Sequence, residues 1–299
     1  MASYDYGNAR IAALRSRLLD AAELRGLAEA GSAGGFLARL ERADDWRPIL
    51  RDTAPLVADP QGAAEASIER HRSARLGSLP GLYPMPARGL VEALVLPLDR
   101  ERIVALVRRR AAGEAAEAIG STIVGGALLD AAALGELARA STLAGLVRGL
   151  AARGLIRPTD TALVGAEPAG VDRRRLEGVL VTALERARLD RARGRGADAA
   201  RVRALIAREA ADRGTVAREL AEAGPAAAAL LERALTLARL DATAHEARRD
   251  PLGIGTVAGY VAAVEAQAIR LRACLARVVA GWGHDLVGSY LGSYPRPGS

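Results

Sequence analysis

The stretch Asp250-Pro251-Leu252-Gly253-Ile254-Gly255 begins a long amphipathic pattern near the end of the chain. The carboxylate of Asp250 is suited to cap a helix, and Pro251 suits the first helical position, where no N–H is needed. Apolar residues then recur at alternating spacings of three and four: Ile254, Val257, Val261, Val264, Ala268, Leu271, Leu275 and Val278. The opposite side carries Glu265, Gln267, Arg270, Arg272 and Arg277. The pattern predicts a helix over Pro251–Ala280 that packs through one face.

The composition also favours helices. The chain has 299 residues, of which 50% are hydrophobic but only 3% aromatic, with a single phenylalanine, Phe36. Ala, Leu and Val must therefore fill the core. Ala, Leu, Arg and Glu rank high in helix propensity, whereas a sheet protein normally uses more Ile, Tyr, Phe and Thr. We expect an all-α fold.

The chain is basic, with a formal net charge of +7, and all 42 of its basic residues are arginine. A GC-rich genome that favours Arg codons explains this, and a nucleic-acid or lipid surface is the competing explanation. Such surfaces cluster their basic residues or interleave them with stacking aromatics. Here arginines are scattered, often one turn from Glu or Asp. We interpret the runs Arg108–Arg110 and Arg173–Arg175 as helix faces or ends and expect no nucleic-acid partner.

The residues that catalysis or metal binding would require are sparse. With no lysine in the chain, a Walker A loop is impossible. His71, His245 and His284 are far apart in sequence, and the single cysteine, Cys274, excludes an intramolecular disulfide and a zinc cluster. We expect no catalytic residue, no metal and no cofactor.

No segment has the pattern of a signal peptide or of a membrane span. The chain starts polar and acidic, and its longest uncharged stretches, such as Pro251–Val264, are shorter than the roughly 18–20 residues that a span requires. We expect a cytoplasmic protein that meets a membrane only through another protein.

Proline and glycine divide the chain. The sequence predicts a first helix over Asn8–Leu27 and two helices, Ala87–Leu96 and Asp99–Ala112, that Pro97 separates. Asp99 and Asp198 are the expected N-caps of their helices. Gly77–Pro86 and Arg193–Gly196 are the candidate boundaries. They predict lobes over residues 1–80, 81–193 and 194–287, followed by a flexible tail over 288–299.

A short sequence pattern that occurs three times points weakly to an internal repeat. Arg10, Arg102 and Arg201 each begin the pattern R-[IV]-x-A-L, at spacings of roughly a third of the chain. In a chain rich in Ala, Leu and Arg, five-residue matches also arise by chance.

Both ends and the middle of the chain resemble one family. The sequence motif D-P-L-G-x-G-x-V, followed by Y-V and by E-x-x-x-[IV]-R-L-R, resembles the C-terminal region of the central-stalk subunit of V/A-type rotary ATPases. This subunit is called C in prokaryotes and d in eukaryotes. The opening Tyr6–Ile11 resembles the family's first helix, and Asp99–Arg109 resembles its internal D-x-x-N-L-x-x-L-L-R. The residues of interest that match are Asn8, Arg10, Asp250, Pro251, Gly253, Tyr260, Glu265, Arg270 and Arg272. The sequence departs from the pattern at Arg102, Ala262-Ala263 and Gln267.

The resemblance implies a function. It implies a funnel of three helical lobes in a pseudo-threefold arrangement, peripheral to the membrane as part of the ATPase. The expected partners are the central-shaft subunits and the membrane proteolipid ring, between which the subunit passes torque without catalysis. Within the C-terminal motif, Glu265, Arg270 and Arg272 are expected to form structural ion pairs.

Two other classes remain open. One is a basic all-helical adaptor or nucleic-acid-binding protein with no rotary role, which a one-sided cluster of arginines would favour. The more distant one is an enzyme, which a buried pocket joining the histidines with carboxylates would favour.

Overall fold

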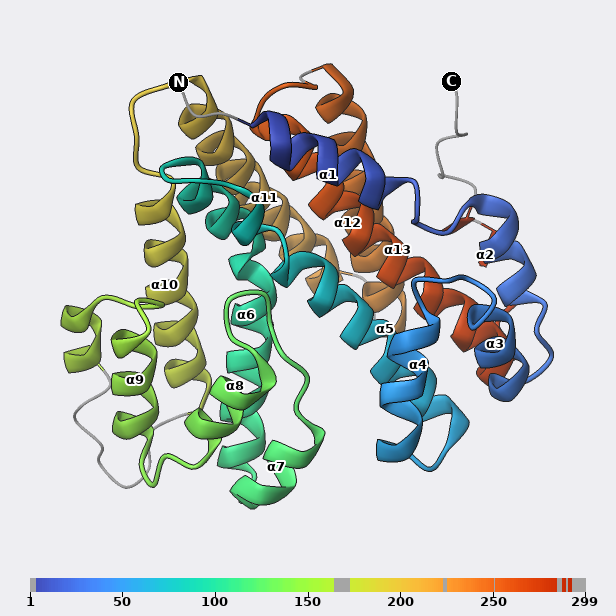
Figure 1. Ribbon diagram of the computed structural model, residues 1–299. Coiled ribbons are helices and arrows are strands. Elements are labelled where there is room, and N and C mark those ends of the chain that lie inside the picture. Colours follow the sequence, from blue (N-terminus) through green and yellow to red (C-terminus); the bar gives the residue numbers. More distant parts are fainter. Residues whose placement is uncertain are drawn as a thin grey trace. The chain divides into compact units, whose positions relative to one another are not determined.

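The computed structural model describes residues 4–163, 173–222, 225–249, 251–283, 287–288 and 290–291. Within these ranges the chain forms α-helices, short 3-10 helices and no strand, so the expected all-α class is confirmed (Figure 1). Asp250 and most of the predicted tail, 289 and 292–299, lie outside the described residues. The elements are α1 Asp5–Arg15, α2 Ala21–Ala28, α3 Ala33–Leu40, α4 Arg47–Thr53, η1 Ala54–Leu56, α5 Pro60–Gly77, η2 Pro80–Leu82, α6 Ala87–Ala111, α7 Ala116–Thr122, α8 Ala131–Ala138, α9 Leu143–Ala152, η3 Pro158–Leu163, α10 Arg173–Arg191, α11 Ala197–Glu222, α12 Pro225–Glu246, η4 Ala247–Arg249 and α13 Ile254–Ala280.

The chain divides into two compact units. The first, unit 1, joins Met1–Ala87 to Ala204–Ser299, and the second, unit 2, is Arg88–Arg203. The two ends of the chain therefore fold together. The first division follows the Pro- and Gly-rich stretch Gly77–Pro86, and the second falls inside α11.

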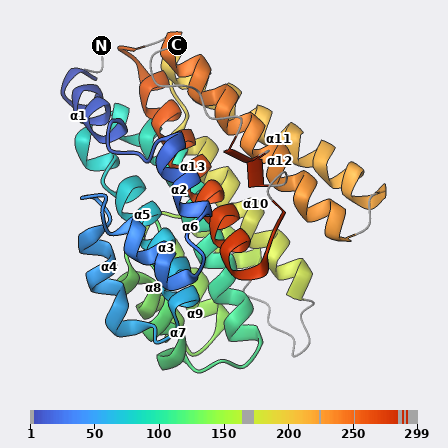
Figure 2. The same ribbon diagram turned by 90° about the vertical axis from the view of Figure 1, so that its right-hand side faces the viewer.

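In unit 1, α13 is the central helix, in contact with α1, α2, α3, α5 and α12. Figures 1 and 2 show these helices from both ends of the chain lying along it. The expectation of a single buried face is wrong, because Gln267 and Arg270 on the predicted polar side are each only 2% exposed. Small residues allow this close packing: a Cβ on Gly259 would overlap the Cβ of Ala247.

The predicted start of α13 and the predicted first helix also need correction. The last helix begins at Ile254, with Gly253 at its N-cap position, while Pro251 lies in the preceding turn. The expected helix Asn8–Leu27 is two helices, α1 and α2. The peptide N–H of Leu19 leaves the helix pattern and donates to the side chain of Gln267 at 2.7 Å. A capping box between Asp20 and Glu23 then starts α2.

Unit 2 is built around α6, which runs unbroken through Pro97. The predicted break at this proline is wrong. Proline has no N–H and therefore leaves the carbonyl four residues earlier, that of Ala93, without its helical donor. The buried Arg188 on α10 donates from its Nε to this oxygen at 2.8 Å. The core of the unit contains Leu96 and Ile103 from α6, with apolar residues of α7, α8, α9 and α10.

The prediction that Asp198 is the N-cap of its helix is also wrong, because Asp198 lies inside the helix. Asp198 lies in the first turn of α11, which begins at Ala197, and the carbonyl of Gly196 accepts the N–H of Ala200 at 3.1 Å. A carboxylate in the first turn still faces the positive end of the helix dipole.

Among the described residues, no helix is both long and apolar enough to cross a membrane.

Candidate functional site

The polar residues of the C-terminal motif lie in ion pairs within unit 1. Arg72 on α5 donates to Glu265 on α13, with 2.7 Å between Nη2 and Oε2 and 3.0 Å between Nε and Oε1. Arg272 pairs with Glu65, at 3.3 Å, and with Glu69. The Arg72–Glu265 pair is largely desolvated, with side chains 7% and 21% exposed, whereas Glu65 is 44% exposed. Opposite charges alternate between the two helices and hold them in one register.

Arg270 forms a second, more deeply buried pair. Its Nη2 donates to both carboxylate oxygens of Asp241 on α12, at 2.7 and 2.8 Å, and its Nε donates to the carbonyl of Tyr290 at 3.2 Å. One guanidinium thus joins α13 to α12 and to the segment after α13. A buried arginine of this kind needs a partner, because an unpaired buried charge costs several kcal/mol.

Arg272 differs from a fully solvated arginine because its guanidinium is partly removed from water. Burial lowers the pKa of Arg272, while the carboxylate of Glu65 raises it. A guanidinium remains charged despite such a shift, so the pair stays ionic.

Asn8 joins the two ends of the chain. Its Nδ2 donates to the carbonyls of Pro251 and Gly253, each at 3.3 Å, and its Oδ1 accepts from the hydroxyl of Tyr83 at 2.9 Å. The neighbouring Gly7 must be glycine, since a Cβ there would overlap the Tyr83 ring. We call this arrangement the Asn8 junction. The other N-terminal motif residue, Arg10, is exposed on α1.

Tyr260 is fully buried in α13. Its hydroxyl has no hydrogen-bond partner among the described residues. Burial raises the pKa of Tyr260, and Arg75 lowers it, so the phenol stays neutral at neutral pH.

Asp99 is not a helix cap, because it lies inside α6. Its fully buried carboxylate accepts the N–H of Leu128, at 3.0 Å, and of Leu129, at 2.9 Å. A Cβ on Gly126 would overlap Asp99 Oδ1, so only glycine allows this approach. Burial raises the pKa of Asp99 to about 6, against the lowering effect of the peptide N–H donors. Asp99 anchors the loop before α8.

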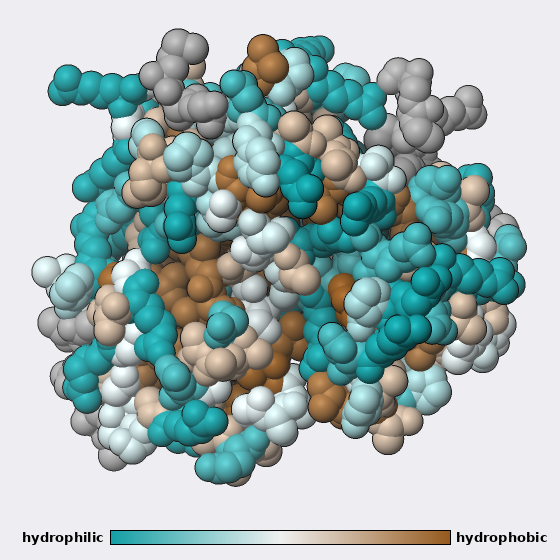
Figure 3. All heavy atoms as spheres, in the orientation of Figure 1, coloured by the Kyte–Doolittle hydropathy of each residue, from teal (hydrophilic) through white to brown (hydrophobic). Residues whose placement is uncertain are grey.

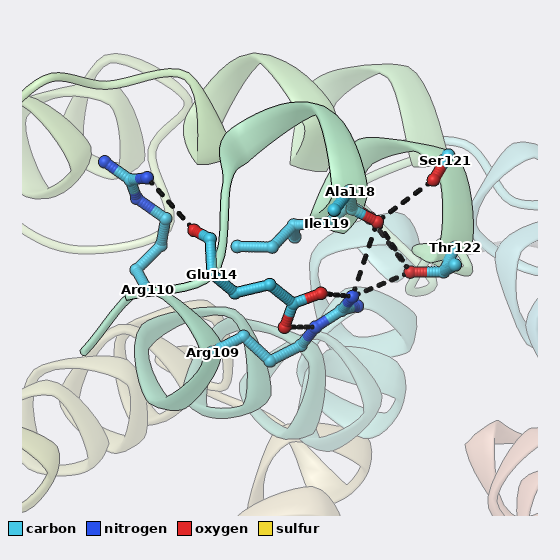
Figure 4. A network of polar contacts seen from close by, with 7 residues as sticks. All are labelled: Arg109, Arg110, Glu114, Ala118, Ile119, Ser121 and Thr122. Carbon is cyan, nitrogen blue, oxygen red and sulfur yellow. Dashed lines mark hydrogen bonds and ion pairs between the residues drawn. The ribbon is translucent and has the colours of Figure 1, made fainter. Parts of the chain in front are cut away.

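The arginine run Arg108–Arg110 is bound within unit 2, and Figure 4 shows the contacts of Arg109 and Arg110. Arg109 donates to Glu114, at 2.7 Å from Nε to Oε2, and to the hydroxyl of Thr122 at 2.8 Å. Arg110 donates to the carbonyls of Glu114 and Ala140. Arg108 pairs with Glu177 on α10 at 2.7 Å. The run therefore ends α6 and binds the following loop, while the side chains of Arg173–Arg175 lie outside the described part.

Histidines and acidic residues do not form a recognisable metal site in the described part of the chain. His71 is buried with its ring stacked on Trp46, at a centroid distance of 4.0 Å, and burial lowers its pKa to about 4. His245 is exposed, and His284 lies outside the described residues. Figure 3 shows hydrophilic side chains scattered over the visible face, with hydrophobic ones between them.

Comparison with known proteins identifies the chain. Residues 7–166 match the family of the ATP synthase (C/AC39) subunit, and this match covers more than half of the sequence. The chain belongs to this family. The matched range contains Asn8, Arg10 and Asp99, whereas the C-terminal motif lies beyond it.

A curated relative agrees with the family. The C subunit of the A-type ATP synthase from Methanocaldococcus jannaschii is 28% identical to the chain over 150 residues. The aligned part is 50% of this chain and 37% of the relative, so the chain spans well under half the length of that protein in the alignment.

Several residues of these sites are absent from the sequence prediction. Arg72, Asp241 and Tyr83 pair with residues 193, 29 and 75 positions away, respectively. No local spacing marks such partners, because helix periodicity reports only neighbours three or four residues apart. The Pro- and Gly-rich stretch around Tyr83 predicts a boundary between lobes. No pattern in that stretch predicts that Tyr83 donates to Asn8.

Proposed function

We propose that this protein is a non-catalytic central-stalk subunit of a V/A-type rotary ATPase or ATP synthase. It acts as the socket that couples the central shaft to the membrane proteolipid ring during ion transport. The observation that carries the proposal is the family match over residues 7–166. The likeness to the C subunit of an A-type ATP synthase supports it.

The internal contacts suit a part that transmits torque. A torque-bearing element must resist deformation, and helices in close contact through small side chains have little room to shift. The Arg72–Glu265 and Arg270–Asp241 pairs add directional bonds between α13 and its neighbours. Arg188 preserves the long helix α6 across its proline.

The three lobes, over residues 1–80, 81–193 and 194–287, form a funnel in this proposal, with the shaft tip inside and the ring at the wide side. The subunit is peripheral to the membrane and held there by the ATPase. In this proposal Pro251, Gly253, Glu265, Arg270 and Arg272 maintain the fold rather than contact a partner.

The test is affinity purification of the tagged protein from its native membranes in mild detergent, with mass spectrometry of the recovered proteins. We expect the proteolipid ring, the shaft subunits and the ATP-binding subunits. As a control, the same tag on an unrelated protein from these cells should recover none of them. ATP-driven ion uptake by membrane vesicles should be lost in a strain that lacks the gene and return when the gene does. Recovery of the protein alone, or with nucleic acid, would replace the proposal with the basic adaptor.

A further inference from the structure

One sequence pattern occurs in both units. Leu18–Ala30 and Leu128–Ala140 each read L-L-D-A-A-x-L-x-x-L-A-x-A. In each copy the aspartate caps one helix and a hydroxyl caps the next. The capping residues are Asp20 and Ser32 for α2 and α3, and Asp130 and Thr142 for α8 and α9. The N–H of the second leucine donates to the long helix of its unit: Leu19 to Gln267 of α13, at 2.7 Å, and Leu129 to Asp99 of α6, at 2.9 Å.

The two copies also share a third helix, which is α5 in unit 1 and α10 in unit 2. The pattern [IL]-E-R-x-R covers Ile68–Arg72 and Leu184–Arg188. Its last arginine is buried in both copies and bonds to the long helix of the same unit, Arg72 to Glu265 and Arg188 to the carbonyl of Ala93. The variable position is His71 in unit 1 and Ala187 in unit 2, and both residues are buried. Unit 1 therefore has a buried titratable residue where unit 2 has a residue that does not titrate.

The surroundings of His71 oppose its protonation. The residue is 2% exposed, and its ring is stacked on that of Trp46, with 4.0 Å between the centroids and 9° between the planes. Arg75 donates from Nε to His71 Nε2 at 3.4 Å, so this nitrogen serves as an acceptor. A proton on Nε2 would remove the acceptor and place a second cation beside the arginine, in a site with little access to water.

No neighbouring carboxylate offsets such a charge. Asp45 is already shared by Arg75 and Arg17. The helices packed against α5 are α3, α4 and α13. Their charged side chains are bound elsewhere: Arg39 to the carbonyl of Gly26, Arg47 to Asp44, Glu265 to Arg72, Arg270 to Asp241, and Arg272 to Glu65 and Glu69. On α13, Tyr260 near Arg75 is a neutral phenol. Within the described part of the chain, His71 has no acidic partner.

Trp46 connects His71 to the core of unit 1. It is fully buried and belongs to the same apolar cluster as Leu40, Ile68 and Leu271. Its indole Nε1 has no hydrogen-bond partner among the residues described, so packing alone holds the ring. Trp46 is also the residue directly before α4. Loss of the stack would therefore release the start of α4 from α5.

We propose that the Trp46–His71 stack is an acid-sensitive switch that opens unit 1 locally. When the imidazole takes up a proton it moves into water, and Trp46 and α4 separate from α5. Unit 2 has no such switch on α10, because Ala187 stands in place of the histidine. The switch is a property of the folded chain and its test needs only the purified protein, so failure of the rotary proposal would leave it unaffected.

The direction of the response follows from the two protonation states. Burial lowers the pKa of His71 from 6.5 to about 4, so the closed stack requires the neutral ring and is fully stable above pH 6.5. As the pH falls from 6.5 to about 4, opening becomes easier by at most about tenfold per pH unit, or about 300-fold in total. Asp99 gives unit 2 the opposite sign, since burial raises its pKa to about 6.

The first measurement follows Trp46. The chain has two tryptophans, so Trp282→Phe leaves Trp46 as the only one. Fluorescence emission of this variant is recorded from pH 7 to 4, alone and combined with His71→Phe or His71→Gln. Phenylalanine retains a ring that can stack, and glutamine retains an acceptor for Arg75, but neither takes up a proton. The matched control is His245→Phe, which removes an exposed histidine of the same unit. Circular dichroism at pH 7 establishes that each variant folds.

The second measurement needs no tryptophan substitution. Amide exchange with mass spectrometry, corrected for the intrinsic rate at each pH, gives the protection of α4 in unit 1 and of α9 in unit 2. We expect the protection of α4 in the wild type to fall by about tenfold to 100-fold between pH 6.5 and 4.5, and that of α9 to be maintained. The Trp46 emission should move to longer wavelength over the same range. Either His71 variant should abolish both responses, and His245→Phe should alter neither.

Three results would overturn the switch. Unchanged Trp46 emission and α4 protection down to pH 4 would show that the stack does not open, even if the imidazole titrates. An equal acid response in the His71 variants would assign the response to other groups. A parallel loss of protection in α9 would show that the whole chain unfolds in acid, rather than one part of unit 1.

Discussion

The long helices α6 and α13, one in each unit, respond in opposite ways to a proline. Pro97 lies inside α6, and the helix continues, whereas Pro251 stands where a helix should begin, and α13 starts three residues later. Local rules predict the reverse at both places. In each case a polar side chain distant in sequence binds the carbonyls near the proline: Arg188 binds that of Ala93, and Asn8 binds those of Pro251 and Gly253. Hydrogen-bond donors from distant parts of the chain therefore influence whether a helix continues or begins at a proline.

The two helices also satisfy their buried charges differently. On α13, Arg270 faces the carboxylate of Asp241. On α6, the carboxylate of Asp99 faces the peptide N–H groups of Leu128 and Leu129. Ion pairs and peptide donors differ in strength and in pH dependence, so the comparison can be tested by removing one partner at a time.

The largest effect should come from Arg270→Met. The substitution leaves the Asp241 carboxylate and the Tyr290 carbonyl without their donor, and breaking a buried ion pair costs about 3–5 kcal/mol. Urea unfolding measures the loss. Replacing both partners, in Arg270→Met/Asp241→Leu, should recover much of it, because no charge then stays unpaired. If the double variant is as unstable as the single one, packing rather than charge is the role of Arg270.

Arg188→Met should destabilise the protein by about 1–3 kcal/mol, since it leaves the buried Ala93 carbonyl without a donor. The decisive comparison is the same substitution in a Pro97→Ala background. Alanine restores the peptide N–H that α6 lacks, so the Ala93 carbonyl no longer needs the guanidinium. Arg188→Met should then cost less, although the contact of Arg188 with Glu185, at 3.6 Å, is lost in both backgrounds. An equal cost in both, measured by urea unfolding, would refute the account of the unbroken helix.

These cases show what the sequence predicts and what it omits. The all-α class follows from a composition rich in Ala, Leu and Arg, and the body of α13 follows from its three–four spacing. The spacing fails to reveal that Gln267 and Arg270 are buried, because their partners, Leu19 and Asp241, lie on other helices. The family-like residues at the two ends of the chain can be recognised from the sequence as motifs. No sequence pattern predicts that these two ends contact each other through Asn8.

Asp99 should produce a pH dependence that α13 does not share. Burial raises its pKa from 3.8 to about 6, so the folded state binds this proton more tightly than the unfolded state does. The stability that this carboxyl contributes is complete below the unfolded pKa and declines as the pH rises through about 6. The slope is at most about 1.4 kcal/mol per pH unit.

The measurement is urea unfolding from pH 4 to 7 for the wild type and for Asp99→Asn. The asparagine does not titrate, so the difference between the two should shift across this range. A constant difference would mean that Asp99 is ionised throughout, with the peptide N–H donors outweighing its burial.

The smallest effect should come from Asn8→Ala, at about 0.5–1.5 kcal/mol. The two bonds from Asn8 to Pro251 and Gly253 are long, at 3.3 Å each, so their loss costs less than that of a buried ion pair. If Asn8 positions the turn before α13, amide exchange over residues 255–258 should quicken in this variant. Arg10→Ala, an exposed change on the same helix, should alter neither stability nor exchange, because surface substitutions usually stay within about 0.5 kcal/mol. Unchanged exchange in Asn8→Ala would show that Gly253 alone sets the start of α13, and that the link between the chain ends is a consequence of the fold rather than a cause.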